Sequence, residues 1–146
     1  MVAEGIYQWD EVYPNEEVLA EDIQNQELYL MTEEETLLAC IVINESQDEA
    51  YGSASWKYNE GRIAVIHRLC VSSEYQGIGI GRKTMQLAEA MIKKAGYSSI
   101  RLDAYSDNPY ARKLYERLGY TYVGIVRFRK GLFYLMEKSC KDISAS

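Results

Sequence analysis

A run of closely spaced glycines is the strongest candidate for chemistry in this chain. The segment from Gln76 to Arg82 reads QGIGIGR and contains Gly77, Gly79 and Gly81. It separates a β-rich run from a helical pattern, so its backbone N–H groups can approach an anion where the helix dipole favours negative charge. A tight turn without a ligand is the simpler interpretation, because an isolated glycine motif is weakly specific. The spacing fits neither G-x-G-x-x-G nor a P-loop ending in G-K-[ST], so neither of these nucleotide sites is predicted.

The cysteines and the net charge argue against several other classes of function. Cys40, Cys70 and Cys140 are odd in number and irregularly spaced, which disfavours both a disulfide framework and a zinc site. His67 is close to Cys70 in sequence, but residues three apart on a strand point to opposite faces, so a cysteine nucleophile is not predicted. The net charge of -6 disfavours a nucleic-acid partner and favours a cationic acceptor such as an amine.

Length and composition are those of one soluble globular domain. The chain has 146 residues, of which 47% are hydrophobic and 26% are charged, and we expect a single domain over residues 1–146. Its apolar runs are too short to cross a bilayer, and its first residues lack the features of a secretion signal. We therefore expect a cytoplasmic protein that has no membrane partner.

The first part of the chain predicts a short helix followed by a meander of strands. Pro14 and the acidic residues after it predict a helix that continues to about Asn25. Residues 28–31 and 37–43 are predicted to form strands on either side of a Glu-rich turn, and residues 51–58 a further strand. An antiparallel arrangement is the natural interpretation.

The middle of the chain predicts a strand, the glycine segment and a helix. Residues 63–71 form the β-rich run, and apolar residues from Met85 to Ala95 have helical spacing that ends at Gly96. Residues 100–105 then predict another strand. This order of elements indicates an α/β architecture with a mixed sheet.

The last part of the chain predicts a second helix and a closing hairpin. Asn108 is the expected N-cap, Pro109 the first helical residue and Gly119 the stop signal. Residues 122–127 and 132–137 are the expected hairpin strands. The expected buried face of the helix consists of Ala111, Leu114, Tyr115 and Leu118.

Two motifs resemble those of the GNAT superfamily of acyl-CoA-dependent N-acyltransferases. The first, V-x-x-x-x-[QR]-x-x-G-x-[GA], is matched by Val71, Gln76, Gly79 and Gly81. The second, N-x-x-A-x-x-x-Y followed by a leucine-glycine-aromatic end, is matched by Asn108, Ala111, Tyr115, Leu118, Gly119 and Tyr120. The resemblance extends from Tyr7 to Lys138. It implies a mostly antiparallel central sheet that splays in the middle and is flanked by helices.

The resemblance also implies acetyl-CoA as the acyl donor and requires no metal. The glycine segment would hold the pyrophosphate, and the strand before it would pair with the pantetheine arm. A main-chain N–H near Leu69 would face the thioester oxygen, where negative charge develops during attack. The implied cofactor contacts are Leu69, Cys70, Val71, Gln76, Gly77, Ile78, Gly79, Ile80, Gly81, Arg82 and Asn108.

By the same resemblance, Tyr115 is the acid that protonates the departing thiolate. An ordinary tyrosine pKa of about 10 keeps the phenol protonated above a thiol near 8.5. His67, the only histidine, is a candidate base because its ordinary pKa near 6.5 suits amine deprotonation. The alternatives are that Tyr115 is a core aromatic, that His67 is a packed strand residue, and that a carboxylate acts as base through water.

The resemblance places the acceptor pocket near Tyr7, Trp9, Tyr13 and the hairpin at 127–133. Aromatic side chains there could pack on an amine or hold its cation, although ordinary core or surface roles are equally compatible. Aligned on the family, the chain begins within the first helix near Trp9, which leaves open whether the N-terminal strand is missing.

The expected activity is direct transfer of an acetyl group to a primary amine with both substrates bound. A sensor domain that binds acetyl-CoA without turnover and an interaction module that binds no cofactor are the alternatives. The sequence does not identify the acceptor, which could be a small molecule or a peptide, and it leaves a homodimer open.

Overall fold

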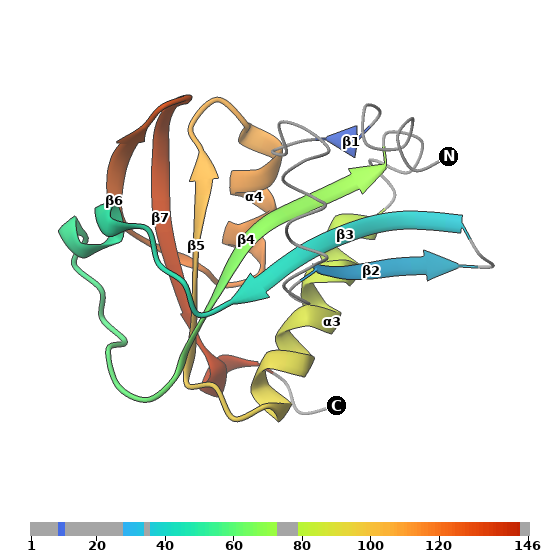
Figure 1. Cartoon of the computed structure of the whole chain (residues 1–146), viewed down its shortest axis with the longest axis horizontal. Coiled ribbons are helices and arrows are strands. Elements are labelled where there is room, and N and C mark those ends of the chain that lie inside the picture. Colours follow the sequence, from blue (N-terminus) through green and yellow to red (C-terminus); the bar gives the residue numbers. More distant parts are fainter. Residues whose placement is uncertain (1–8, 11–27, 34–35, 73–78, 144–146) are drawn as a thin grey trace. The chain divides into compact units, whose positions relative to one another are not determined.

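The computed structural model describes residues 9–10, 28–33, 36–72 and 79–143, which form a mixed sheet and helices (Figure 1). Seven strands within these ranges belong to one sheet with the order β2-β3-β4-β5-β7-β6, and β1 pairs separately with β4. The predicted α/β class with a mostly antiparallel sheet is confirmed. The described elements are β1 (Trp9–Asp10), β2 (Leu28–Glu33), β3 (Thr36–Asn44), η1 (Glu49–Ser53), β4 (Ile63–Ser72), α3 (Ile80–Lys94), β5 (Ser99–Tyr105), α4 (Pro109–Arg117), β6 (Thr121–Phe128), β7 (Gly131–Ser139) and η3 (Cys140–Asp142).

The chain divides into two compact units. One consists of residues 1–44 and 67–87, and the other of residues 45–66 and 88–146. Both β4 and α3 cross from one unit to the other. The predicted single domain over residues 1–146 stays a prediction.

In the first unit, β2 and β3 form an antiparallel pair. Leu28 lies opposite Val42, and the register shifts between Met31 and Thr32. Both predicted strands are confirmed, and each is longer than expected. The strand β3 is buried from Leu38 to Ile43 without alternation, which is typical of a strand covered on both faces.

The N-terminal part of this unit corrects one expectation. Trp9 and Asp10 form a strand that pairs antiparallel with β4, opposite Ser72 and Val71. The backbone at Trp9 is therefore extended, because it pairs with a neighbouring strand, and the prediction that it belongs to a helix is wrong. The predicted helix at 14–25 lies outside the described residues.

The second unit contains β5, β7 and β6, with β7 in the middle (Figure 1). Pairing between β5 and β7 runs the full length of β5, from Ser99 opposite Ser139 to Tyr105 opposite Phe133. The predicted hairpin of β6 and β7 is confirmed. The central residues of β7 are buried, including Leu135 and Met136 at 0% exposure, so this strand contributes much of the core.

The signals that delimit α4 act as the sequence predicts. The Asn108 side chain accepts a hydrogen bond from the backbone N–H of Ala111 at 3.1 Å, and Pro109 is the first helical residue. After the helix, Gly119 has a φ of 97°, a conformation that glycine adopts without a steric penalty. Of the expected buried face, Leu114, Tyr115 and Leu118 are buried and Ala111 is half-buried.

The predicted strand at 51–58 is wrong. Residues Glu49–Ser53 form a 3-10 helix instead, with the Asp48 carboxylate accepting from the N–H of Ala50 at 2.9 Å. Further on, the backbone N–H groups of Lys57 and Tyr58 donate to the buried Glu137 carboxylate at 2.8 and 3.2 Å. Side chains therefore satisfy backbone donors that a neighbouring strand would otherwise satisfy.

Arg101 on β5 fixes the same irregular segment. Its guanidinium donates to the carbonyl of Tyr58 at 2.9 Å and to the side chains of Gln47 and Asn59 at 2.8 and 3.0 Å. It also stacks 4.2 Å from the centre of the Trp56 ring. Burial lowers the pKa of Arg101, and the negative charge of Glu137 partly offsets this effect.

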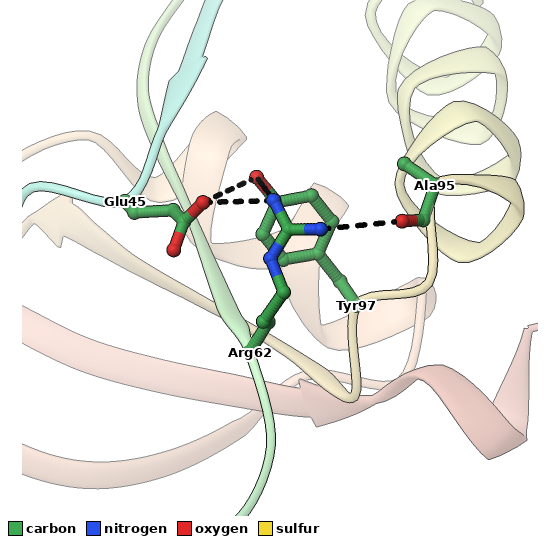
Figure 2. A network of polar contacts seen from close by, with 4 residues as sticks. All are labelled: Glu45, Arg62, Ala95 and Tyr97. Atoms are coloured by element: carbon green, nitrogen blue, oxygen red, sulfur yellow. Dashed lines mark hydrogen bonds and ion pairs between the residues drawn. The ribbon is translucent and has the colours of Figure 1, made fainter.

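An exposed network connects Glu45 and Arg62, which lie before and after this irregular segment, to the turn after α3 (Figure 2). The Arg62 guanidinium lies 2.9 Å from the Glu45 carboxylate and 4.2 Å from the centre of the Tyr97 ring. It also donates to the carbonyl of Ala95 at 3.5 Å, while the Tyr97 hydroxyl donates to Glu45 at 2.9 Å. These contacts hold residues 45 and 62 beside the turn at Tyr97.

Candidate active site

The ladder between β4 and β5 covers only part of either strand. Its parallel pairs run from Ile63 opposite Ser99 to Ile66 opposite Leu102. The strand β4 nevertheless continues to Ser72, and β5 continues to Tyr105. The predicted pantetheine-binding residues 69–71 therefore lie on the part of β4 beyond this ladder. Ligands of α/β sheets characteristically bind at the carboxyl ends of parallel strands.

Within those residues, Leu69 is half-buried and Cys70 and Val71 are buried. Val71 lies opposite Asp10 of β1 in the antiparallel register. Its backbone thus belongs to a strand pair in this structure. The predicted pairing of residues 69–71 with a pantetheine arm stays a prediction.

Gly79, a member of the glycine segment, immediately precedes α3. Its φ is +86°, and its carbonyl accepts the N–H of Lys83 at 3.0 Å, so α3 continues directly from it. A Cβ built on Gly79 would meet no atom within 4 Å, which leaves open space beside the first turn. Open space at a helix N-terminus suits an anion such as a phosphate.

The remaining residues of the glycine segment have different surroundings. Gly81 is buried, Ile80 is half-buried and Arg82 is exposed. The Thr84 hydroxyl donates to the carbonyl of Ile80 at 2.7 Å, which adds a bond to the first turn. Gln76, Gly77 and Ile78 lie outside the described residues.

His67 on β4 bonds to a side chain of β3. Its Nε2 lies 2.6 Å from the carboxamide oxygen of Asn44, and the imidazole is half-buried. Because that oxygen can only accept, Nε2 carries the proton of this bond. In the neutral imidazole, Nδ1 is then the acceptor nitrogen.

Tyr115 lies in the second unit, on the buried face of α4. Its side chain is 6% exposed, and its ring contacts Tyr120 edge-on at a centroid distance of 5.9 Å. Tyr120 is itself 3% exposed, and burial raises the pKa of its phenol well above the ordinary value, with the negative charge of Glu89 adding to the effect. Two motif residues therefore pack against each other. Asn108, the predicted cofactor contact, caps the same helix.

Sequence reasoning missed Asp103 on β5 and its partner Tyr51. The Tyr51 hydroxyl donates to the Asp103 carboxylate at 2.6 Å. Burial raises the pKa of Tyr51 above its usual range, and the charge and hydrogen bond of Asp103 raise it further. The available signal was an aspartate inside a β-rich run, where this residue is depleted.

The predicted acceptor residues are described only in part. Tyr7 and Tyr13 lie outside the described residues, and Trp9 is described by its backbone alone. In the hairpin, Arg127 is exposed, whereas Phe133 is buried between the rings of Tyr105 and Phe128 at 5.1 and 5.2 Å. Phe133 therefore belongs to the hydrophobic core, so its side chain is not an exposed acceptor contact.

Comparison with known proteins settles the family. The sequence profile of the Acetyltransferase (GNAT) family matches residues 3–120. The chain belongs to the GNAT family. The profile spans both the glycine segment at the start of α3 and the second motif on α4.

The relatives of this GNAT chain agree with that assignment. It is 25% identical over 123 residues to the uncharacterized N-acetyltransferase YesJ of Bacillus subtilis, covering 82% of this chain and 68% of that protein. A GNAT-family acetyltransferase of Streptococcus agalactiae has the same fold, with a TM-score of 0.75, 23% identity and coverage of 87% of this chain and 73% of the other. Arabidopsis thaliana Naa50, bound to the bisubstrate analogue CoA-Ac-MVNAL, has a TM-score of 0.68, 19% identity and coverage of 94% and 89%.

The three cysteines of the GNAT chain belong to its hydrophobic core. Cys40, Cys70 and Cys140 are all buried and form no disulfide, and burial raises the pKa of Cys140. No group of three or more His, Cys, Asp or Glu residues suited to a metal occurs among the residues that the structure describes. Of the described helices, none combines the length and apolar composition that a membrane crossing requires.

Proposed function

We propose that this GNAT protein transfers an acetyl group from acetyl-CoA to a primary amine by direct attack. The observation that carries the proposal is the start of α3, where Gly79, a residue of the first family motif, leaves open space at a helix N-terminus. Such a place suits the pyrophosphate of CoA. Tyr115, buried in the second motif, supports the catalytic half of the proposal.

In the proposed step, the neutral amine nitrogen forms a bond to the acetyl carbon and the carbon–sulfur bond breaks. The nitrogen gives up a proton, which we assign to Nδ1 of His67, with a carboxylate acting through water as the alternative. The thiolate that leaves takes the proton of the Tyr115 hydroxyl. Both side chains then return to their starting states by exchange with solvent.

The acceptor is proposed only as a class, a small-molecule or peptide amine. The net charge of -6 favours a cationic acceptor over an anionic one. The Naa50 complex contains an analogue that joins CoA to a peptide, which supports testing peptide amines beside small ones.

Release of the CoA thiol from acetyl-CoA across a panel of amines tests the proposal. The panel contains butylamine, ethanolamine, alaninamide and a short alanyl peptide. We expect release that depends on both the amine and the protein. A thermal shift with acetyl-CoA but no turnover on any amine would favour the sensor alternative, and no shift would favour an interaction module.

A further inference from the structure

Asp103 lies where β5 leaves its parallel ladder with β4. Leu102 is the last residue of that ladder, and Asp103 follows it on the same strand. On the other side β5 stays paired with β7, and Asp103 lies opposite Leu135. The carboxylate is therefore attached to a rigid strand near the carboxyl end of a parallel pair, where ligand-binding groups are commonly found.

Tyr51 holds one oxygen of this carboxylate. The hydroxyl donates at 2.6 Å, and the Tyr51 side chain is only 2% exposed, packed among Val65, Phe133 and Leu135. A donated hydrogen bond favours the ionised form of a carboxylate.

Tyr115 interacts electrostatically with Tyr51, the hydrogen-bond partner of Asp103. It is among the groups that raise the pKa of Tyr51, after burial, Asp103 and Asp48. The helix that carries Tyr115 contacts β5, and all of these residues belong to one compact unit. The Asp103 carboxylate and the proposed acid therefore belong to one local arrangement.

We propose that Asp103 binds the acceptor amine and stabilises the positive charge that its nitrogen gains during attack. This inference rests on the proposed function. As the carbon–nitrogen bond forms, the neutral nitrogen becomes ammonium-like while the carbonyl oxygen becomes negative. The nitrogen then loses a proton to the base, and the carbon–sulfur bond breaks. An ionised carboxylate beside the nitrogen lowers the energy of this charge, because it is already oriented before the reaction.

Asp103→Asn tests the inference, because it removes the charge while keeping the shape. With the amine panel, kcat/KM for the amine is expected to fall roughly 10²-fold, in the range seen when one oriented electrostatic group is removed. Acetyl-CoA affinity, measured by calorimetry, is expected to stay unchanged. Asp107→Asn, a neutralisation at an exposed position in the same region of the chain, is the matched control and should behave like the wild type.

A second variant keeps the test decisive if Asp103→Asn does not fold. Asp103→Glu retains the charge but displaces it by one methylene, and it is expected to lower kcat/KM for amines with acetyl-CoA affinity unchanged. Wild-type kcat/KM in either folded variant overturns the inference, as does a parallel loss of acetyl-CoA affinity. Absence of turnover by the wild-type protein on every amine is a separate result, which rejects the proposed function and the inference with it.

Discussion

The ammonium of Lys138 on β7 lies 3.1 Å from a carboxylate oxygen of Glu89 on α3, and both side chains are almost completely buried, at 8% and 5% exposure. The second carboxylate oxygen lies 3.2 Å from the same ammonium. Lys138 also lies 5.6 Å from the centre of the Tyr120 ring, which packs on Tyr115. The Glu89–Lys138 pair therefore supports Tyr120, against which the proposed acid Tyr115 packs.

Removing one member of this pair should destabilise the protein strongly. Glu89→Gln is expected to lower the free energy of unfolding by about 3–5 kcal/mol, because it leaves the Lys138 charge buried without its counter-ion. The double variant Glu89→Leu with Lys138→Met should cost much less, because it removes both charges. Denaturant unfolding measures the free energy of unfolding of the single and the double variant. The exposed ion pair of Arg62 and Glu45 is the control. If Arg62→Met lowered the free energy of unfolding as much as Glu89→Gln, the prediction would be contradicted.

The Glu45 carboxyl should titrate below its ordinary pKa of 4.5, first because Arg62 donates a hydrogen bond to it and next because Tyr97 does. A carboxyl with a lowered folded pKa contributes stability above its unfolded pKa. That contribution is lost as the pH falls through the folded pKa. In Arg62→Ala the pKa of Glu45 should rise toward 4.5, as followed by NMR titration. An unchanged value would show that the network of Figure 2 does not act on this carboxyl.

Gly79→Val should weaken acetyl-CoA binding in a protein that still folds. The reason is conformational as well as steric, because valine tolerates a φ of +86° poorly and the start of α3 must shift. Gly52→Val is the matched control, since a Cβ there also meets no atom within 4 Å but its φ is not in the left-handed region. Calorimetric titration with acetyl-CoA should separate the two variants. Equal affinities would remove the start of α3 from the proposed site.

Tyr115→Phe should slow the chemical step by roughly 10²- to 10⁴-fold, the range typical of a general acid. Acetyl-CoA affinity should change little, because the ring and its contact with Tyr120 remain. A core tyrosine would behave differently, losing about 1–3 kcal/mol of stability through an unpaired partner while turnover stayed near normal. Single-turnover kinetics make the distinction, and a wild-type rate in a stable variant would rule out the acid role.

The sequence predicted those parts of the fold that local patterns determine. The cap at Asn108, the stop at Gly119 and the closing hairpin all depend on residues that are near in sequence, and each is confirmed. The segment at 51–58 was mispredicted because its backbone donors reach Glu137, about eighty residues away. Local β-propensity contains no information about such a partner.

The candidate site could be predicted only as far as its motifs extend. Gly79 and Tyr115 belong to motifs with fixed spacing, so the sequence pointed to both. Asp103 belongs to neither motif, and its contact with Tyr51 exists only because η1 packs over the sheet. Tertiary packing created this feature, so no spacing rule could have revealed it.

The most direct test of direct transfer is the initial rate of CoA release measured while acetyl-CoA and an amine are varied together. The account predicts double-reciprocal lines that intersect, because both substrates must be bound before the thioester is attacked, and one N-acetylated product per CoA released. Parallel lines with an acetylated protein detected by mass spectrometry in the absence of amine would contradict it, because they would show transfer through a covalent intermediate.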